Sequence, residues 1–237
     1  KYPYGPRKIA TYYDKLMTKI LNYDSYYAQG GDWGGAISTW LGYDHYKNCK
    51  GIHLNIMIVR DKNGPQDEAE KAWQKRFKDE QSLEEGYRTM QATKPQTLAF
   101  AMTDNPVGVA AWILEKFYGW SDLRKKSLIE VYGYDDLITN LMLYILTNSF
   151  NSASWIYFGR REEGGRVINF DGGKVNVPTA CALYPKELLS WPPKSYVDRL
   201  FNVVQWNEYP SGGHFAALEE PNTLVKDIRS FFSAIRN

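Results

Sequence analysis

The sequence predicts an α/β protein in which a parallel sheet is interrupted by a long helical insertion. Strand patterns occur at four places, residues 23–29, 50–59, 175–183 and 201–206. Between the second and third of them, the apolar residues follow a helical period. The third observation is a glycine-rich turn that joins the first strand pattern to a helical segment. Strand, turn, helix and strand in this order are typical of a parallel sheet with helices on its faces.

The turn is Gly30-Gly31-Asp32-Trp33-Gly34, a small-x-nucleophile-x-small pattern with aspartate at its centre. Such an elbow needs small flanking residues because neighbouring side chains would collide in the sharp turn from strand to helix. The preceding residues 23–29 are predicted as the strand and residues 36–42 as the helix. Aspartate at the centre predicts nucleophilic attack that forms an ester. The five residues alone leave open an ordinary turn in which Asp32 caps the helix.

Composition excludes several classes of function. The 237 residues are 43% hydrophobic, enough to bury the core of one large domain or of a domain with an insertion. The net charge is +2 and no basic stripe is present, so we expect no binding to nucleic acid. No apolar run is long enough to span a membrane.

No cofactor or metal is expected. Cys49 and Cys181 lie far apart without the spacing of a zinc site, and we expect both to be buried and reduced. His45, His53 and His214 do not share a metal-binding motif with carboxylates. Glycine-rich motifs for dinucleotides or nucleotide phosphates do not occur either.

The order of the elements predicts the C-terminal part of an α/β-hydrolase sheet with an inserted helical cap. Residues 1–64 and 172–237 are assigned to the hydrolase core, and residues 65–171 to the cap. Helical segments are predicted at residues 67–81, 83–93, 106–117, 137–147 and 222–235. Only about 24 residues precede the nucleophile strand, whereas this fold needs several earlier strands. We therefore expect a longer protein whose N-terminal part is missing here; a shortened fold is the alternative.

Partners for Asp32 are expected in the chain order nucleophile, acid, base. His214 lies in Gly212-Gly213-His214-Phe215, between the last strand and the final helix, where a catalytic base is expected. Glu187 directly follows the third strand and is the preferred acid, with Asp198 in reserve and Asp171 as a further candidate. Two alternatives remain: His214 is a solvated loop histidine, and Glu187 is a glutamate in the first turn of a helix.

Long stretches of the sequence resemble the microsomal and juvenile-hormone type of epoxide hydrolase. The resemblance covers nearly the whole chain and rests on residues 30–34 (GGDWG), 93–97 (TKPQT), 105–117 (NPVGVAAWILEKF), 137–144 (LITNLMLY) and 212–221 (GGHFAALEEP). It implies that Asp32 is the nucleophile, that His214 activates water and that Glu187 orients His214.

The resemblance also implies groups that stabilise charge. Tyr87 and Tyr157 would donate a proton to the epoxide oxygen, and composition alone does not single them out among 18 tyrosines. The residues from 151 to 158 depart from the family's usual sequence. The backbone N–H of Trp33 would be one oxyanion donor. The family's second donor comes from a His-Gly-x-Pro loop, which this sequence does not contain.

The function that the resemblance implies is hydrolysis of a lipophilic epoxide to a vicinal diol. The alternatives are a haloalkane dehalogenase-like hydrolase, which uses the same aspartate elbow, and a truncated hydrolase-fold protein without activity. The expected partners are a small hydrophobic epoxide and water, with homo-oligomer formation left open. A cytoplasmic location is expected for this chain, although members of the family can carry an N-terminal membrane anchor.

Overall fold

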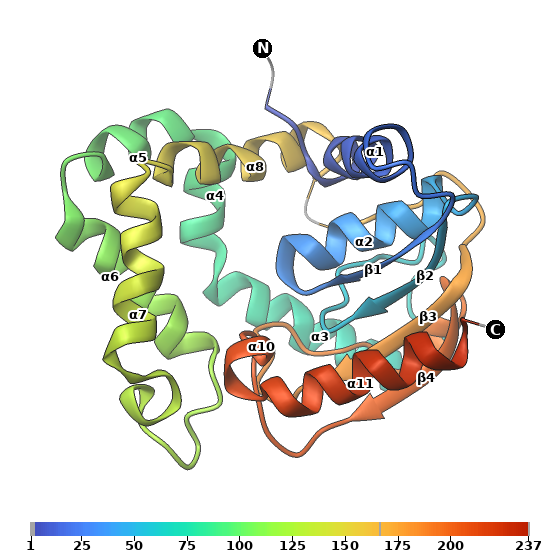
Figure 1. Ribbon diagram of the computed structural model, residues 1–237. Coiled ribbons are helices and arrows are strands. Elements are labelled where there is room, and N and C mark those ends of the chain that lie inside the picture. Colours follow the sequence, from blue (N-terminus) through green and yellow to red (C-terminus); the bar gives the residue numbers. More distant parts are fainter. Residues whose placement is uncertain (1–2, 166, 237) are drawn as a thin grey trace.

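The computed structural model describes residues 3–165 and 167–236 and contains one parallel four-stranded sheet (Figure 1). The strand order is the chain order, β1 (Tyr26–Gly30), β2 (Cys49–Leu54), β3 (Val175–Leu183) and β4 (Phe201–Glu208). The expected α/β class is confirmed. The second strand is shorter than the predicted 50–59, because the chain leaves the sheet after Leu54. Val59 pairs again only in an isolated bridge with Ile168.

Helices cover both faces of the sheet. Ile52 in β2 faces α2 (Asp32–Asp44), since a β-carbon on Gly42 of that helix would contact the Ile52 side chain. His53, the next residue, faces α11 (Pro221–Ala234), as strand geometry requires. The remaining helices of the sheet layer are α1 (Pro6–Lys15), the π-helical η1 (Leu16–Ile20), α9 (Lys194–Asp198) and α10 (Ala216–Glu219). The two cysteines are buried and unpaired, as predicted.

Between β2 and β3, the chain forms the predicted helical insertion. Its helices are α3 (Glu68–Leu83), α4 (Glu85–Thr93), α5 (Pro95–Met102), α6 (Pro106–Trp120), α7 (Leu128–Leu146) and α8 (Phe150–Glu162). Helices α4–α8, the cap helices, lie beside the sheet in Figure 1. Helix α3 packs instead against the sheet layer, because Trp73 and Phe77 belong to the main core cluster. The domain boundaries at residues 64 and 171 stay predictions.

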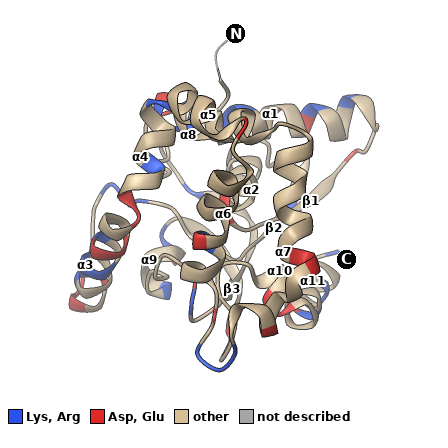
Figure 2. Ribbon diagram, turned by 90° about the vertical axis from the view of Figure 1, so that its left-hand side faces the viewer, with Lys and Arg blue, Asp and Glu red and all other residues tan. Residues whose placement is uncertain are grey.

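Charge and capping explain where several of these helices form. Figure 2 shows Lys and Arg interspersed with Asp and Glu along α3, a pattern typical of a solvated face. The Asp67 carboxylate caps α3 by accepting the N–H of Glu70 at 2.8 Å. Ser127 and Glu130 form a capping box at the start of α7. Helices α5 and α8 were not predicted, since α5 has only eight residues and polar residues interrupt the apolar pattern in the first turns of α8 at Asn151, Ser152 and Ser154.

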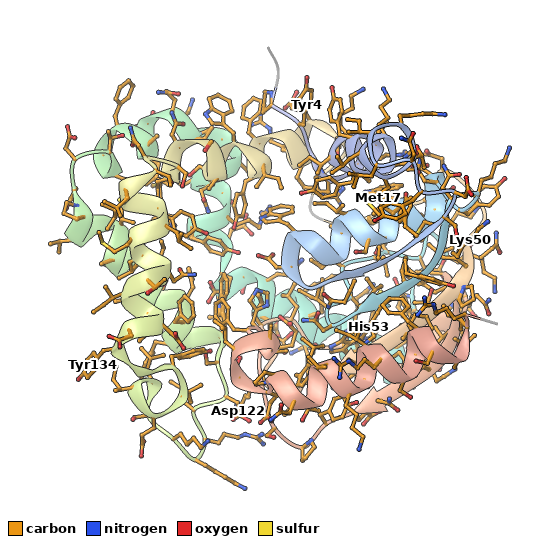
Figure 3. The ribbon with its side chains drawn as sticks, in the orientation of Figure 1. Tyr4, Met17, Lys50, His53, Asp122 and Tyr134 are labelled. Carbon is orange, nitrogen blue, oxygen red and sulfur yellow. The ribbon has the colours of Figure 1, made fainter. Side chains whose placement is uncertain are left out.

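A buried polar cluster fastens α11 to the sheet. The Asp227 carboxylate on α11 lies 2.9 Å from Nε2 of His53 and accepts a hydrogen bond of 2.8 Å from the Asn207 amide. The Tyr209 hydroxyl donates to the same carboxylate. His53 is labelled in Figure 3 at the centre of the sheet layer. Burial acts to raise the pKa of Asp227, but the hydrogen bonds from His53, Tyr209 and Asn207 outweigh it and hold the pKa below its usual value.

Replacing Asp227→Asn should destabilise the protein at pH 7 by about 1–3 kcal/mol, because a buried charged acceptor is lost. A carboxyl whose native pKa is lowered stabilises the fold above the unfolded pKa of about 3.9, and this contribution is lost as the pH falls through the native pKa. The difference between wild type and variant should therefore shrink below about pH 4 in urea unfolding. Asp135→Asn, on an exposed position of α7, is the control. A difference that persists unchanged in acid would contradict this account.

Candidate active site

The glycine-rich turn forms the expected elbow between β1 and α2. Asp32 has a φ of +45°, a left-handed conformation that costs a residue with a side chain about 1–3 kcal/mol. A β-carbon on Gly30 would lie 2.1 Å from the backbone of Gly34, and one on Gly35 would lie 2.6 Å from the Ile56 side chain. A β-carbon on Gly34 would meet nothing within 4 Å. The glycine requirement therefore holds at Gly30 and Gly35, whereas the requirement expected at Gly34 is wrong.

The ends of β3 and β4 bring Glu187 and His214 together. Lys186 and Gly213 form a parallel bridge just beyond the two strands, so that the residues following them are neighbours. Nδ1 of His214 lies 2.6 Å from Oε1 of Glu187. On the other side of the imidazole, Nε2 is 3.8 Å from Oδ2 of Asp32. The nucleophile, acid and base candidates thus meet in one place.

Burial differs sharply among these three side chains. Those of His214 and Glu187 are 3% and 1% exposed, whereas that of Asp32 is 52% exposed. Burial acts to lower the pKa of His214, but the carboxylates of Glu187 and Asp32 outweigh it and raise the pKa to about 10. His214 is therefore an imidazolium at neutral pH in this state.

The two other acid candidates lie elsewhere. Asp198 forms an exposed ion pair of 2.8 Å with Lys194 in α9. Asp171 pairs with Arg7 at 2.7 Å. Neither of them is hydrogen-bonded to His214 among the described residues, so Glu187 is the carboxylate that contacts the imidazole.

Tyr87 of α4 and Tyr157 of α8 reach the nucleophile from the cap helices. Their ring centroids are 5.9 Å apart, and the Tyr157 ring packs edge-on against Trp33 at 4.8 Å. Burial raises the pKa of both tyrosines, and the charge of Asp32 raises it further, so both hydroxyls stay protonated. Trp33 lies in the first turn of α2, where a backbone N–H has no acceptor within the helix.

Two apolar cavities meet at Asp32, Trp33, Tyr87 and Tyr157. One, of about 260 Å³, extends among the cap helices, and its aromatic lining residues are Trp112, Phe117, Trp120, Tyr144, Phe150 and Phe215. The other, of about 80 Å³, extends toward the sheet layer, where Ile56, Ile58, Leu188 and Leu189 line it. Such largely apolar walls with a few polar groups are typical of sites for small apolar ligands.

Several residues join the cap to the histidine loop, which is formed by residues 210–215. These joining residues were not predicted from the sequence. The His214 N–H donates to the Trp120 carbonyl at 2.9 Å, and the Trp120 ring packs edge-on against the imidazole. Glu219 accepts the N–H groups of Asp122 at 2.7 Å and of Phe215 at 2.9 Å. Figure 3 shows Asp122 where the cap meets the sheet layer. No periodicity marks such residues, because their role depends on two loops that are distant in sequence.

Known proteins resemble the chain over nearly its whole length. It is 35% identical over 233 residues to a putative epoxide hydrolase of Stigmatella aurantiaca, covering 97% of this chain and 51% of the relative. It is 33% identical over 243 residues to epoxide hydrolase 1 of Sus scrofa, covering 93% of this chain and 53% of the relative. The chain is therefore homologous to epoxide hydrolases over most of its length. It spans about half the length of these curated relatives.

Solved structures agree with this similarity and show the fold. The juvenile hormone epoxide hydrolase of Bombyx mori superimposes with a TM-score of 0.85 at 27% identity, covering 100% of this chain and 60% of that one. An α/β-hydrolase fold is therefore shown for this chain. No model of a protein family matches it. Within the described residues, no helix is long and apolar enough to cross a membrane.

Gly30 and Gly34 of the elbow should respond differently to substitution. Gly30→Ala should destabilise the fold by about 3 kcal/mol or more, because its methyl group meets backbone atoms that cannot move aside. Gly34→Ala should be neutral or stabilising by less than about 1 kcal/mol, since alanine favours a helix. Thermal unfolding of both variants measures the contrast. Equal losses in the two variants would contradict the geometry described for the elbow.

The pKa of His214 should identify its acid. Glu187→Gln should lower that pKa from about 10 by about one to three units, because the nearest buried negative charge is removed. The matched control Asp198→Asn should leave the pKa of His214 unchanged. NMR titration of the imidazole resonances provides the measurement. If the Asp198 variant produced the larger shift, the assignment of Glu187 would be wrong.

Proposed function

We propose that this chain carries the active site of an epoxide hydrolase that works through a covalent ester on Asp32. One observation supports the proposal: the candidate catalytic side chains lie around the same cavity. The exposed carboxylate of Asp32 lies beside His214, and it lines the same cavity as the hydroxyl-bearing side chains of Tyr87 and Tyr157. A nucleophile, a base and two proton donors around one cavity match the needs of ring opening followed by ester hydrolysis.

In the first step, a carboxylate oxygen of Asp32 attacks a carbon of the epoxide ring. The carbon–oxygen bond of the ring breaks, and the oxygen leaves as an alkoxide that takes a proton from Tyr87 or Tyr157. The raised pKa of both tyrosines keeps that proton available at neutral pH. The product of this step is a hydroxyalkyl ester of Asp32.

In the second step, the loss of charge on Asp32 changes the state of His214. One of the two carboxylates that raise the pKa of His214 is now a neutral ester, so the pKa falls and the imidazolium releases its proton to solvent. Neutral His214 then accepts a proton from a water molecule, whose oxygen attacks the ester carbonyl. The oxyanion lies near the backbone N–H of Trp33, and its collapse releases the diol and restores Asp32. The proton released earlier to solvent returns to the tyrosinate, and His214 keeps the proton taken from water, so the cycle ends with the imidazolium and the tyrosine hydroxyl restored.

The substrate class follows from the cavity walls. Aromatic side chains line the larger cavity, which favours a small hydrophobic epoxide. The paired hydroxyls favour an epoxide over an alkyl halide, because an alkoxide needs a proton whereas a halide needs only donors. A homo-oligomer, a cytoplasmic location, a membrane anchor in a longer protein and a catalytically inactive chain stay predictions.

Turnover of styrene oxide in ¹⁸O-labelled water tests the covalent step. After several turnovers, the peptide that contains Asp32 should carry the label, because water attacks the carbonyl carbon of the ester and leaves its oxygen there. Asp32→Ala should abolish both turnover and labelling. Full activity in this variant, or active protein without label in that peptide, would refute the covalent mechanism.

The tyrosines provide the second arm of the same experiment. Tyr87→Phe combined with Tyr157→Phe should reduce ring opening by about 10²-fold or more, because no proton donor remains for the alkoxide. The far-ultraviolet circular dichroism should stay unchanged. The exposed Tyr134→Phe in α7 is the control. Unchanged turnover in the double variant would assign the proton donor to another group and reopen the dehalogenase alternative.

A further inference from the structure

Arg160 is a buried cation beside the proposed site to which no role has been assigned. It lies on α8 three residues after Tyr157, so the two side chains leave the same face of the helix. Only 5% of the residue is exposed. Its Nη2 atom is buried and has no hydrogen-bond partner. Within the described residues, no hydrogen bond or ion pair from this guanidinium is found.

The carboxylates near Arg160 are occupied by other groups. Glu163, whose charge acts on Arg160 from the next turn, accepts the backbone N–H groups of Arg7 at 2.9 Å and Lys8 at 3.0 Å. Glu84, which lines the smaller cavity with Arg160, binds the Lys116 ammonium at 2.9 Å. A buried charge without a paired anion is costly, and an anionic ligand would remove this cost.

Arg160 connects the smaller cavity beside Asp32 to a neighbouring one. Both cavities have Trp33, Tyr157, Arg88 and Arg160 in their walls. The neighbouring cavity has a volume of about 260 Å³, and Arg161 and two threonine hydroxyls, Thr89 and Thr93, also line it.

Arg160 differs from the other two arginines of this neighbouring cavity. Arg88 is paired with Glu85 at 2.7 Å, and Arg161 is paired with Glu162 at 2.9 Å. Arg160 is therefore the cation that is left to receive a ligand. A planar guanidinium presents the fork of N–H donors that matches a carboxylate.

We propose that Arg160 binds a carboxylate carried by the substrate, so that the site prefers epoxides with an anionic group over neutral ones. This proposal rests on the proposed function of the same site and specifies its substrate class. Side chains three residues apart on a helix are about 5–6 Å apart at their β-carbons. A substrate whose epoxide oxygen contacts Tyr157 therefore places a carboxylate near Arg160 when a short spacer joins the two groups. The apolar cavity walls then hold the spacer.

A rigid pair of epoxides tests this preference. 4-(Oxiran-2-yl)benzoate and 4-(oxiran-2-yl)benzamide have the same shape and differ in charge. The protein should turn over the benzoate with a kcat/KM roughly tenfold higher or more, as expected for a charge-assisted hydrogen bond in a buried site. Arg160→Met should reduce the ratio to about one, and Arg160→Lys should keep part of it. The control Arg229→Met removes the same charge from an exposed position on α11 and should leave the ratio unchanged.

Binding of the two diol products, measured by calorimetry, separates this proposal from the proposed function. The diol of the benzoate should bind more tightly than the diol of the benzamide, and Arg160→Met should abolish the difference. If the binding preference appears while neither epoxide is turned over, the anion site stands and the proposed activity fails. Equal binding of both diols by the wild type, or a preference that survives in a folded Arg160→Met variant, would overturn the proposal. Turnover of the benzamide in the presence of acetate gives a last check. If acetate accelerates this turnover in the wild type but not in Arg160→Met, the site binds a free anion and the proposal is overturned.

Discussion

The hydrogen bond between Glu187 and His214 is the interaction on which the arrangement of the candidate site depends. The Glu187 side chain is 1% exposed, and a buried polar group needs hydrogen-bond partners; His214 supplies one at 2.6 Å, beside the backbone N–H of Leu188 at 2.8 Å. Backbone pairing beyond β3 and β4 brings His214 next to Glu187. Lys186 donates its N–H to the Gly212 carbonyl at 3.1 Å, which aligns the two chain segments beyond β3 and β4. The acid and the base are therefore positioned by strand pairing rather than by side-chain packing alone.

The same imidazole couples the cap helices to the sheet layer. The histidine loop donates the Gly212 N–H to Asp122 at 3.1 Å, in addition to the contact of His214 with Trp120. Arg124 extends this link by donating to the Pro210 carbonyl at 2.8 Å. Because the cap also carries Tyr87 and Tyr157, a shift of the cap against the sheet layer would move the base and the proton donors together. Geometry between these groups is thus preserved by hydrogen bonds that do not touch the reacting atoms.

The sequence indicated the candidate residues that the structure brings together, but it did not indicate the residues that support them. Asp32, His214 and Glu187 could be found because an elbow, a strand end and a loop before the last helix leave local patterns and occur in a fixed order. Glu187 was preferred over Asp198 because it directly follows β3, and the contacts agree with that preference: Glu187 lies against His214, whereas Asp198 pairs with Lys194. Arg160 left no signal either. Arg160 stands out because its buried guanidinium has no paired anion among the described residues, and a sequence does not show which charges are paired.

Errors in the prediction have equally physical causes. The run from residue 50 to 59 alternates and then becomes apolar from Ile56 to Val59, and periodicity cannot separate a buried strand from a buried loop that follows it. Only the register of β2 with β3, which ends at Leu54 and Cys181, marks the end of pairing. Gly34 looked indispensable because the elbow pattern contains it. The steric demand at this turn comes from Gly30, which closely approaches the Gly34 backbone, and from Gly35, which packs against Ile56.

The unequal exposure of two carboxylates around one imidazole supports the roles that the proposed mechanism gives them. Glu187 is covered, so a substrate cannot reach it, whereas about half of the Asp32 side chain is accessible. Esterification can therefore neutralise Asp32 alone and leaves the charge of Glu187 in place. The imidazole then loses the charge of Asp32, at 3.8 Å, and keeps that of Glu187, at 2.6 Å, which fixes its orientation. In the proposed mechanism, this asymmetry makes the base available only after the ester has formed, while the imidazole keeps its orientation toward the ester.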